Sequence, residues 1–270
     1  MSATWYCCRQ RAGNLVKECR ALRPRFSDDD SAIVRNKKAE AKRYYRTAVN
    51  RTPEDRMEER FAVIGWDAWH YVLTFDDQYL PSNYAGVQKT FRAFKMAVRR
   101  WRQKCGKSPD FDWVAIIEGL HGDHRWHIHF VVNYYDLGPV EIKRLWKYGQ
   151  IPDMSPVLQD KEGFWRLAYY FNKERRGGVI PVGKQPFTCS RSLTAKLQAP
   201  EKWKSESNLI EPPENAICFS TPDHLPSIPY DNGWGKFYHL SWIEPDGSPG
   251  CRAAMRRMGY VEESYARATD

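Results

Sequence analysis

The centre of the fold is indicated by two apolar stretches, Trp113-Val-Ala-Ile-Ile-Glu118 and Trp126-His-Ile-His-Phe-Val-Val-Asn133. Both are rich in the β-branched and aromatic residues that favour strands. The segment that begins at Gly119 and runs to Asp123 is short and polar, so it predicts a turn. Two strands joined by such a turn pair as antiparallel neighbours. The sequence therefore predicts an antiparallel hairpin as the centre of a sheet.

Further elements are predicted on both sides of this hairpin. A strand is expected over His70–Phe75, and helices over residues 139–148 and 162–175. Strand-like stretches recur at residues 216–219 and 237–243. A polar helical stretch covers residues 35–50. Strands mixed with helices in this way indicate an α+β fold.

The helix predicted between Ala85 and Lys107 has an apolar face and a basic face. Its apolar residues recur at spacings of three and four, and it contains no acidic residue. A solvated surface helix is one interpretation, and a helix that contacts phosphates is the other. The basic residues on the exposed face are Lys89, Arg92, Lys95, Arg99, Arg100, Arg102, Lys104 and Lys107.

Charge is distributed unevenly along the 270 residues, whose formal net charge is +9. Residues 1–60 carry +6 and residues 61–205 carry +8, whereas residues 206–270 carry −5. A polyanionic partner is therefore expected to meet the first 205 residues. These differences suggest a basic, helical and partly flexible N-terminal appendage over 1–60, a main domain over 61–205 and an acidic accessory segment over 206–270, with ordered structure beginning near His70.

Cellular location and redox state are inferred from what the sequence lacks. No stretch is long and apolar enough to cross a bilayer, and the first residues lack the apolar run of a secretory signal. The seven cysteines include no CxxC pair. We therefore expect reduced thiols, no membrane partner, and a location in the cytoplasm of the cell that makes the protein.

The most specific local pattern is His127-Ile128-His129 within an apolar strand. Residues two apart in a strand project from the same face, so the two imidazoles lie side by side. Glu118 ends the neighbouring predicted strand and lies within reach across the hairpin. Two imidazoles and one carboxylate suit Mg²⁺ or Mn²⁺ acting on a phosphodiester. The competing interpretation is a pair of hydrogen-bonded histidines in the core.

A second pattern lies in the helix expected over 162–175, where Tyr170 and Lys173 share one face. A tyrosine hydroxyl has an ordinary pKa near 10, so it becomes a competent nucleophile only beside a cation or a metal-polarised phosphate. Tyr169 is an alternative nucleophile, but adjacent residues of a helix point about 100° apart. The spacing to Lys173 favours Tyr170.

These parts, in this order, resemble the HUH endonucleases, and specifically the rolling-circle replication initiators of plasmids and single-stranded DNA phages. The first family motif is matched by Tyr71-Val-Leu-Thr-Phe75, the second by His127-Ile128-His129 with Glu118, and the third by Tyr170-Phe-Asn-Lys173. The resemblance covers residues 36–205 and includes Gly183-Lys-Gln-Pro-Phe187, a segment that such initiators often carry.

The resemblance implies a sheet of about five antiparallel strands, related to RNA-recognition-motif sheets, with the metal on one face and the tyrosine helix laid across it. It also implies a transesterification in which Tyr170 cuts single-stranded origin DNA, and a 3′-OH that primes replication. The expected partners are origin DNA, a host helicase and a DNA polymerase. DNA contacts are expected from the basic helix and from Arg175 and Arg176, with both groups flanking the metal.

Three alternatives compete with this interpretation. Histidine-triad nucleotide hydrolases need a third histidine where this chain has Val131. Single-tyrosine transposases use the same chemistry and would differ in the DNA that they cut. A non-catalytic nucleic-acid-binding protein would use the basic helix and the aromatic residues without cutting any bond.

Overall fold

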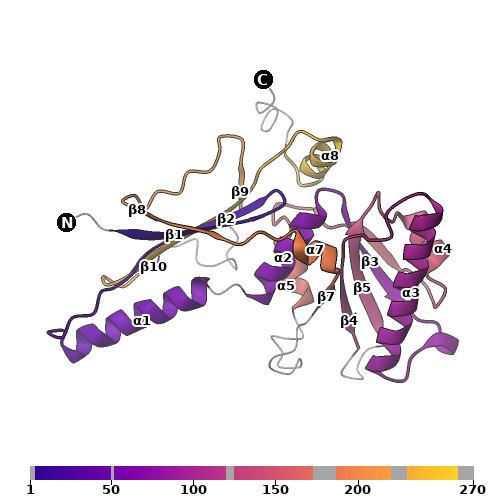
Figure 1. The fold of residues 1–270 in the computed structure, drawn as a ribbon, viewed down its shortest axis with the longest axis horizontal. Coiled ribbons are helices and arrows are strands. Elements are labelled where there is room, and N and C mark those ends of the chain that lie inside the picture. Colours follow the sequence, from indigo (N-terminus) through magenta and orange to yellow (C-terminus); the bar gives the residue numbers. More distant parts are fainter. Residues whose placement is uncertain (1–3, 50–51, 120–124, 173–186, 220–229, 261–270) are drawn as a thin grey trace. The chain divides into compact units, whose positions relative to one another are not determined.

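The computed structural model describes residues 4–49, 52–119, 125–172, 187–219 and 230–260, and its strands form two antiparallel sheets (Figure 1). The chain divides into two compact units. We call Met57–Leu197 the central unit, and Met1–Arg56 together with Gln198–Asp270 the terminal unit. The expected α+β class, with an antiparallel sheet and packed helices, is confirmed.

The central unit is built on a five-stranded sheet in the order β6-β3-β5-β4-β7. The predicted hairpin is confirmed, because β4 and β5 pair antiparallel and Glu118 lies opposite His127. On its other side β5 pairs with β3, where His129 lies opposite Val72. The histidine strand is therefore the middle strand of the sheet. The strands are β3 (Ala68–Thr74), β4 (Trp113–Glu118), β5 (His127–Asn133), β6 (Asp153–Pro156) and β7 (Thr188–Cys189).

One face of this sheet carries the apolar core under α3 (Tyr84–Lys104). Phe130 points to this face and is fully buried, and the rings of Phe91 and Phe94 in α3 each lie 5.7 Å from it. Asn83 caps the start of α3, because its side chain accepts a hydrogen bond from the Gly86 amide. The helix predicted over 139–148 forms on the same side as α4 (Pro139–Leu145). A short 3₁₀ turn, η1 (Asp77–Tyr79), follows β3.

The opposite face carries His127, His129 and Val131, since these residues alternate with the buried core residues of β5. Phe171 at the end of α5 (Trp165–Phe171) packs on this face, with its ring 4.8 Å from that of His129. Phe61 of α2 (Pro53–Ile64) lies 6.1 Å from Phe171. These aromatic contacts fix α5 against the histidine face. A short helix, α7 (Arg191–Ala195), follows β7.

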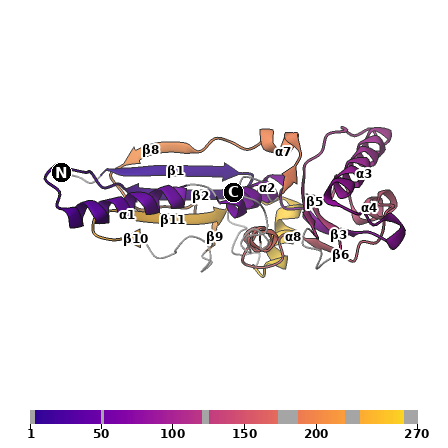
Figure 2. The ribbon, with the colours of Figure 1, turned by 90° about the horizontal axis from the view of Figure 1, so that it is seen from below.

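The terminal unit is built on a six-stranded sheet in the order β10-β11-β2-β1-β8, with β9 also paired to β11. Helix α1 (Ala32–Val49) runs along one face of this sheet (Figures 1 and 2). Helix α8 (Pro249–Arg257) follows the last strand. The strands are β1 (Trp5–Ala12), β2 (Leu15–Leu22), β8 (Glu201–Ser205), β9 (Ile217–Phe219), β10 (Tyr230–Asp231) and β11 (Lys236–Ile243).

The structure corrects the expected N-terminal appendage. The helix near residues 35–50 is present as α1, but ordered structure begins well before His70, because β1 and β2 form a hairpin. Gly13, with φ of 55°, permits its tight turn. Strand β2 then pairs with β11 along its whole length. Both ends of the chain therefore form one sheet, rather than two separate appendages.

Burial of aromatic residues explains this pairing. Trp242 and Phe237 of β11 are 1% and 3% exposed, and a short acidic segment alone could not cover them. The hairpin of β1 and β2 supplies the missing neighbours. The central unit runs from residue 57 to residue 197, against the expected range of 61–205. Within the described ranges, no helix has the length and apolarity to cross a membrane.

Candidate functional site

The candidate site is a cluster formed by Glu118, His127 and His129 on the face opposite α3. One ligand atom from each residue lies within 4.8 Å of the others. The Oε2 atom of Glu118 is 3.1 Å from Nε2 of His127 and 3.4 Å from Nε2 of His129. Both imidazoles therefore converge on one carboxylate oxygen, and the cluster could hold a metal ion.

The cluster is positioned by regular backbone and not by a loop. Its members stand at the adjoining ends of two paired strands, with Glu118 opposite His127. Glu118 is 3% exposed and His129 is 4% exposed. Charges in such a dry site interact more strongly than charges in water. The site is therefore both rigid and electrostatically sensitive.

The hydrogen bonds of His127 test whether this donor set fits a cation. Its Nδ1 atom lies 2.9 Å from the carbonyl oxygen of Arg125, which can only accept, so Nδ1 carries a proton. In a neutral ring the Nε2 lone pair then faces the Glu118 carboxylate. Two such acceptors lie close together only when a cation, either a proton or a metal ion, is shared between them. Two imidazole nitrogens and a carboxylate are suitable ligands for Mn²⁺.

Sequence analysis missed two further residues at this site, His70 and Asp153. The Nε2 atom of His70 lies 2.9 Å from Nδ1 of His129, and the two rings stack with centroids 5.1 Å apart. On its other side, Nδ1 of His70 lies 3.8 Å from Oδ2 of Asp153. Burial, and then the neighbouring His129, lower the pKa of His70 to about 3, so its ring is neutral near pH 7. The one signal in the sequence was the strand alternation that places His70 on the same face as Val72.

Tyr170 is the tyrosine that lies beside the cluster. Its ring lies 6.1 Å from that of His129 at an angle of 86°, and its side chain is 46% exposed. Tyr169 instead contacts Trp165, with ring centroids 6.1 Å apart. The helical offset expected between neighbouring residues thus separates the two tyrosines. Only Tyr170 of the pair lines the cavity described next.

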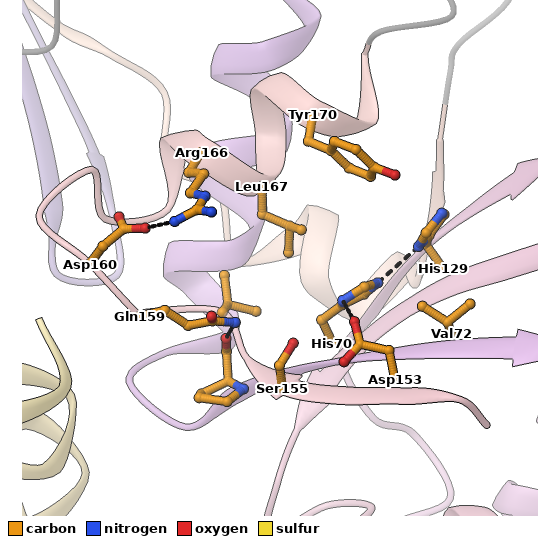
Figure 3. A pocket seen from close by; sticks show the side chains of 12 residues that line it. His70, Val72, His129, Asp153, Ser155, Gln159, Asp160, Arg166, Leu167 and Tyr170 are labelled. Atoms are coloured by element: carbon orange, nitrogen blue, oxygen red, sulfur yellow. Dashed lines mark hydrogen bonds and ion pairs between the residues drawn. The ribbon is translucent and has the colours of Figure 1, made fainter.

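A cavity of about 410 Å³ opens next to His129 (Figure 3). Tyr170 and Leu167 of α5 approach it from one side, and His70 and Asp153 lie on the other (Figure 3). Arg166 forms an ion pair with Asp160 at its edge. The other lining residues are Val72, His129, Ser155, Pro156, Val157 and Gln159.

Several expected residues lie outside the described part of the chain. Residues 120–124 and 173–186 are among them. The expected Tyr170–Lys173 pairing and the positions of the cationic residues after α5 therefore stay predictions. The residues concerned are Lys173, Arg175 and Arg176, together with most of the Gly183–Phe187 segment.

The structure corrects the expectation that the basic helix flanks the metal. Helix α3 packs on the sheet face of Ile128 and Phe130, whereas His127 and His129 project from the other face. Exposed side chains on α3 include Lys89, Arg92, Arg99 and Arg100. Lys95 is half-buried, with its ammonium 4.0 Å from the Trp113 ring centroid. The basic surface and the cluster of Glu118, His127 and His129 are therefore on opposite faces of one sheet.

Arg102 was expected on the exposed basic face, and that placement is wrong. Its side chain is 5% exposed, pairs with Asp136 at 2.8 Å, and donates to the carbonyl oxygen of Ser108. Its guanidinium also lies 5.6 Å from the Phe111 ring centroid. Because the helical turn carries Arg102 toward the loop after α3, it acts as a structural cation.

This difference predicts unequal losses of stability when each of two neighbouring arginines is replaced. We expect Arg102→Met to lower the free energy of unfolding by about 2–3 kcal/mol, since buried acceptors lose a charged donor. Arg100→Met, on the exposed face, should change it by less than about 0.5 kcal/mol. Denaturant unfolding of both variants measures the contrast, and equal stabilities would contradict the structural role of Arg102.

Comparisons with family models, with curated proteins and with solved structures found no match for this chain. Functional assignment therefore depends on the geometry of Glu118, His127, His129 and Tyr170.

Proposed function

We propose that this protein is a metal-dependent endonuclease that nicks single-stranded origin DNA and so initiates rolling-circle replication. The supporting observation is the placement of Tyr170 beside His129, at the edge of a cluster whose ligand atoms lie within 4.8 Å of one another. A nucleophile next to a divalent-metal site is the minimum that phosphodiester transfer requires. The motif order described above supports this function over other metal chemistry.

In the proposed reaction, the phenolic oxygen of Tyr170 forms a bond to the scissile phosphorus and gives up its proton. The bond from phosphorus to the 3′ oxygen breaks, and that oxygen gains a proton. The products are a 5′-phosphotyrosine and a free 3′-OH, which can prime a polymerase. Attack of a 3′-OH on the phosphotyrosine reverses the step and rejoins the strand.

The residues of the cluster hold the reactive groups in place. Glu118, His127 and His129 would bind Mg²⁺ or Mn²⁺, which when bound polarises the scissile phosphate. Tyr170 is close to half exposed, so a DNA strand can reach its hydroxyl. The packing of Phe171 against His129 fixes the end of α5, and with it the approach of the tyrosine.

The test is to mix the full chain with Mn²⁺ and single-stranded oligonucleotides from the flanks of its own gene. The proposed function predicts a protein–DNA adduct that survives denaturing electrophoresis and disappears on nuclease digestion. A transposase would form the same adduct, but with strands from the ends of a mobile element. Salt-sensitive DNA binding without any adduct would contradict the proposal and favour a non-catalytic binding protein.

A further inference from the structure

A row of polar side chains crosses the site face of the central sheet, from β6 to β4. Asp153, His70, His129 and Glu118 occupy successive strands in this row. The register accounts for it, since Val72 lies opposite both Asp153 and His129, and His70 stands two residues before Val72 on the same face. His70 and His129 are 5% and 4% exposed. The contact between them is therefore shielded from competing water.

The hydrogen bond between the two histidines has a direction. When both rings are neutral, only one of the facing nitrogens, Nε2 of His70 or Nδ1 of His129, carries the proton. His129 can bind a metal through Nε2 only if its own proton is on Nδ1. His129 is then the donor, and His70 accepts through Nε2.

This assignment fixes the proton of His70 as well. The proton of the neutral His70 ring must lie on Nδ1, which faces the Asp153 carboxylate 3.8 Å away. That distance is too long for a direct hydrogen bond but close enough for electrostatic attraction. The negative end of the row therefore favours the one arrangement of protons that leaves Nε2 of His129 available.

We propose that His70, assisted by Asp153, is a positioning residue that holds His129 in the Nδ1–H tautomer and in the ring orientation needed for metal binding. The inference rests on the metal site of the proposed function, but not on the nicking reaction. Outer partners of this kind orient a ligating imidazole and increase its basicity. Contacts of the His129 ring with the rings of His70 and Phe171 further restrict its orientation.

The experiment measures Mn²⁺ binding to the metal-free full chain by titration calorimetry. His70→Leu should raise the Kd by about 10–100-fold, because the acceptor for His129 is lost. His70→Gln should recover most of the affinity, since its side-chain oxygen can accept at about the position of Nε2. Asp153→Asn should raise the Kd several-fold. Asp110→Asn, in the exposed segment between α3 and β4, makes the same change as Asp153→Asn away from the row and is the control with unchanged affinity.

The outcomes separate this inference from the proposed function. A wild-type chain that binds no Mn²⁺ would overturn both. Tight wild-type binding with equal affinity in His70→Leu, or a Gln variant as weak as the Leu variant, would overturn only the role of His70. If His70→Leu does not fold, Asp153→Asn serves as the test, because the Asp153 side chain is 55% exposed and its replacement should leave the fold intact. A raised Kd for Mn²⁺ then supports the role of the row, and an unchanged Kd overturns it.

Discussion

Tyr170→Phe should abolish the covalent protein–DNA adduct, with a loss of nicking of about 10⁴-fold or more, as is usual when an enzyme loses its nucleophile. The substitution removes only the phenolic oxygen. Because Tyr170 is about half exposed, the fold and the affinity for Mn²⁺ should be retained. Gel detection of the adduct, with circular dichroism as a folding check, measures the effect.

Tyr169→Phe is the matched control for this prediction. Tyr169 is the neighbour of Tyr170 in the same helix, is similarly exposed, and contacts Trp165 instead of His129. We expect it to nick DNA at nearly the wild-type rate. The reverse pattern, with the adduct lost in Tyr169→Phe and kept in Tyr170→Phe, would move the nucleophile to Tyr169 and refute the assignment made from the geometry.

Glu118→Gln should cause the largest loss of metal affinity. The change keeps the shape of the side chain but replaces the carboxylate on which both imidazoles converge at 3.1 and 3.4 Å. The Kd for Mn²⁺ should rise by more than the roughly 10–100-fold expected for an outer partner such as His70. Nicking should fall with it, and a large excess of Mn²⁺ should restore part of the rate.

Glu141→Gln provides a comparison of identical chemistry at a distant position. Glu141 belongs to α4, which packs on the other face of the sheet. We expect its Mn²⁺ affinity to match the wild-type value. If Glu118→Gln bound Mn²⁺ as tightly as Glu141→Gln, the cluster would be a hydrogen-bonded pair of histidines and not a metal site.

Local sequence patterns were sufficient for most of the central unit. Strand alternation placed His127 and His129 on one face, and the polar hairpin predicted the approach of Glu118; the ligand atoms indeed converge. The spacing of apolar residues predicted α3 within a few residues of its ends. These patterns succeed because each depends on neighbours in the chain, where the geometry of a strand or a helix is nearly constant.

The same patterns failed where pairing is remote in the sequence. Arg102 looked like any other cation of α3, yet it is buried and pairs with Asp136 in the segment after β5. The N-terminal segment looked like a solvated appendage, although its partner is a strand more than 200 residues away. Burial and distant hydrogen bonds are not encoded in a short window of residues, because they depend on which elements meet.

Local patterns in the sequence therefore predicted the α+β class, the central hairpin and the His-x-His pair with its carboxylate, whereas the choice of Tyr170 over Tyr169 stays a prediction. Contacts between remote segments, in contrast, place the basic helix on the sheet face opposite the cluster and add His70 and Asp153 to the cluster across the sheet. Strand order and register are set by side-chain packing between remote segments. That packing brings His70 to within 2.9 Å of His129, although 59 residues separate them along the chain.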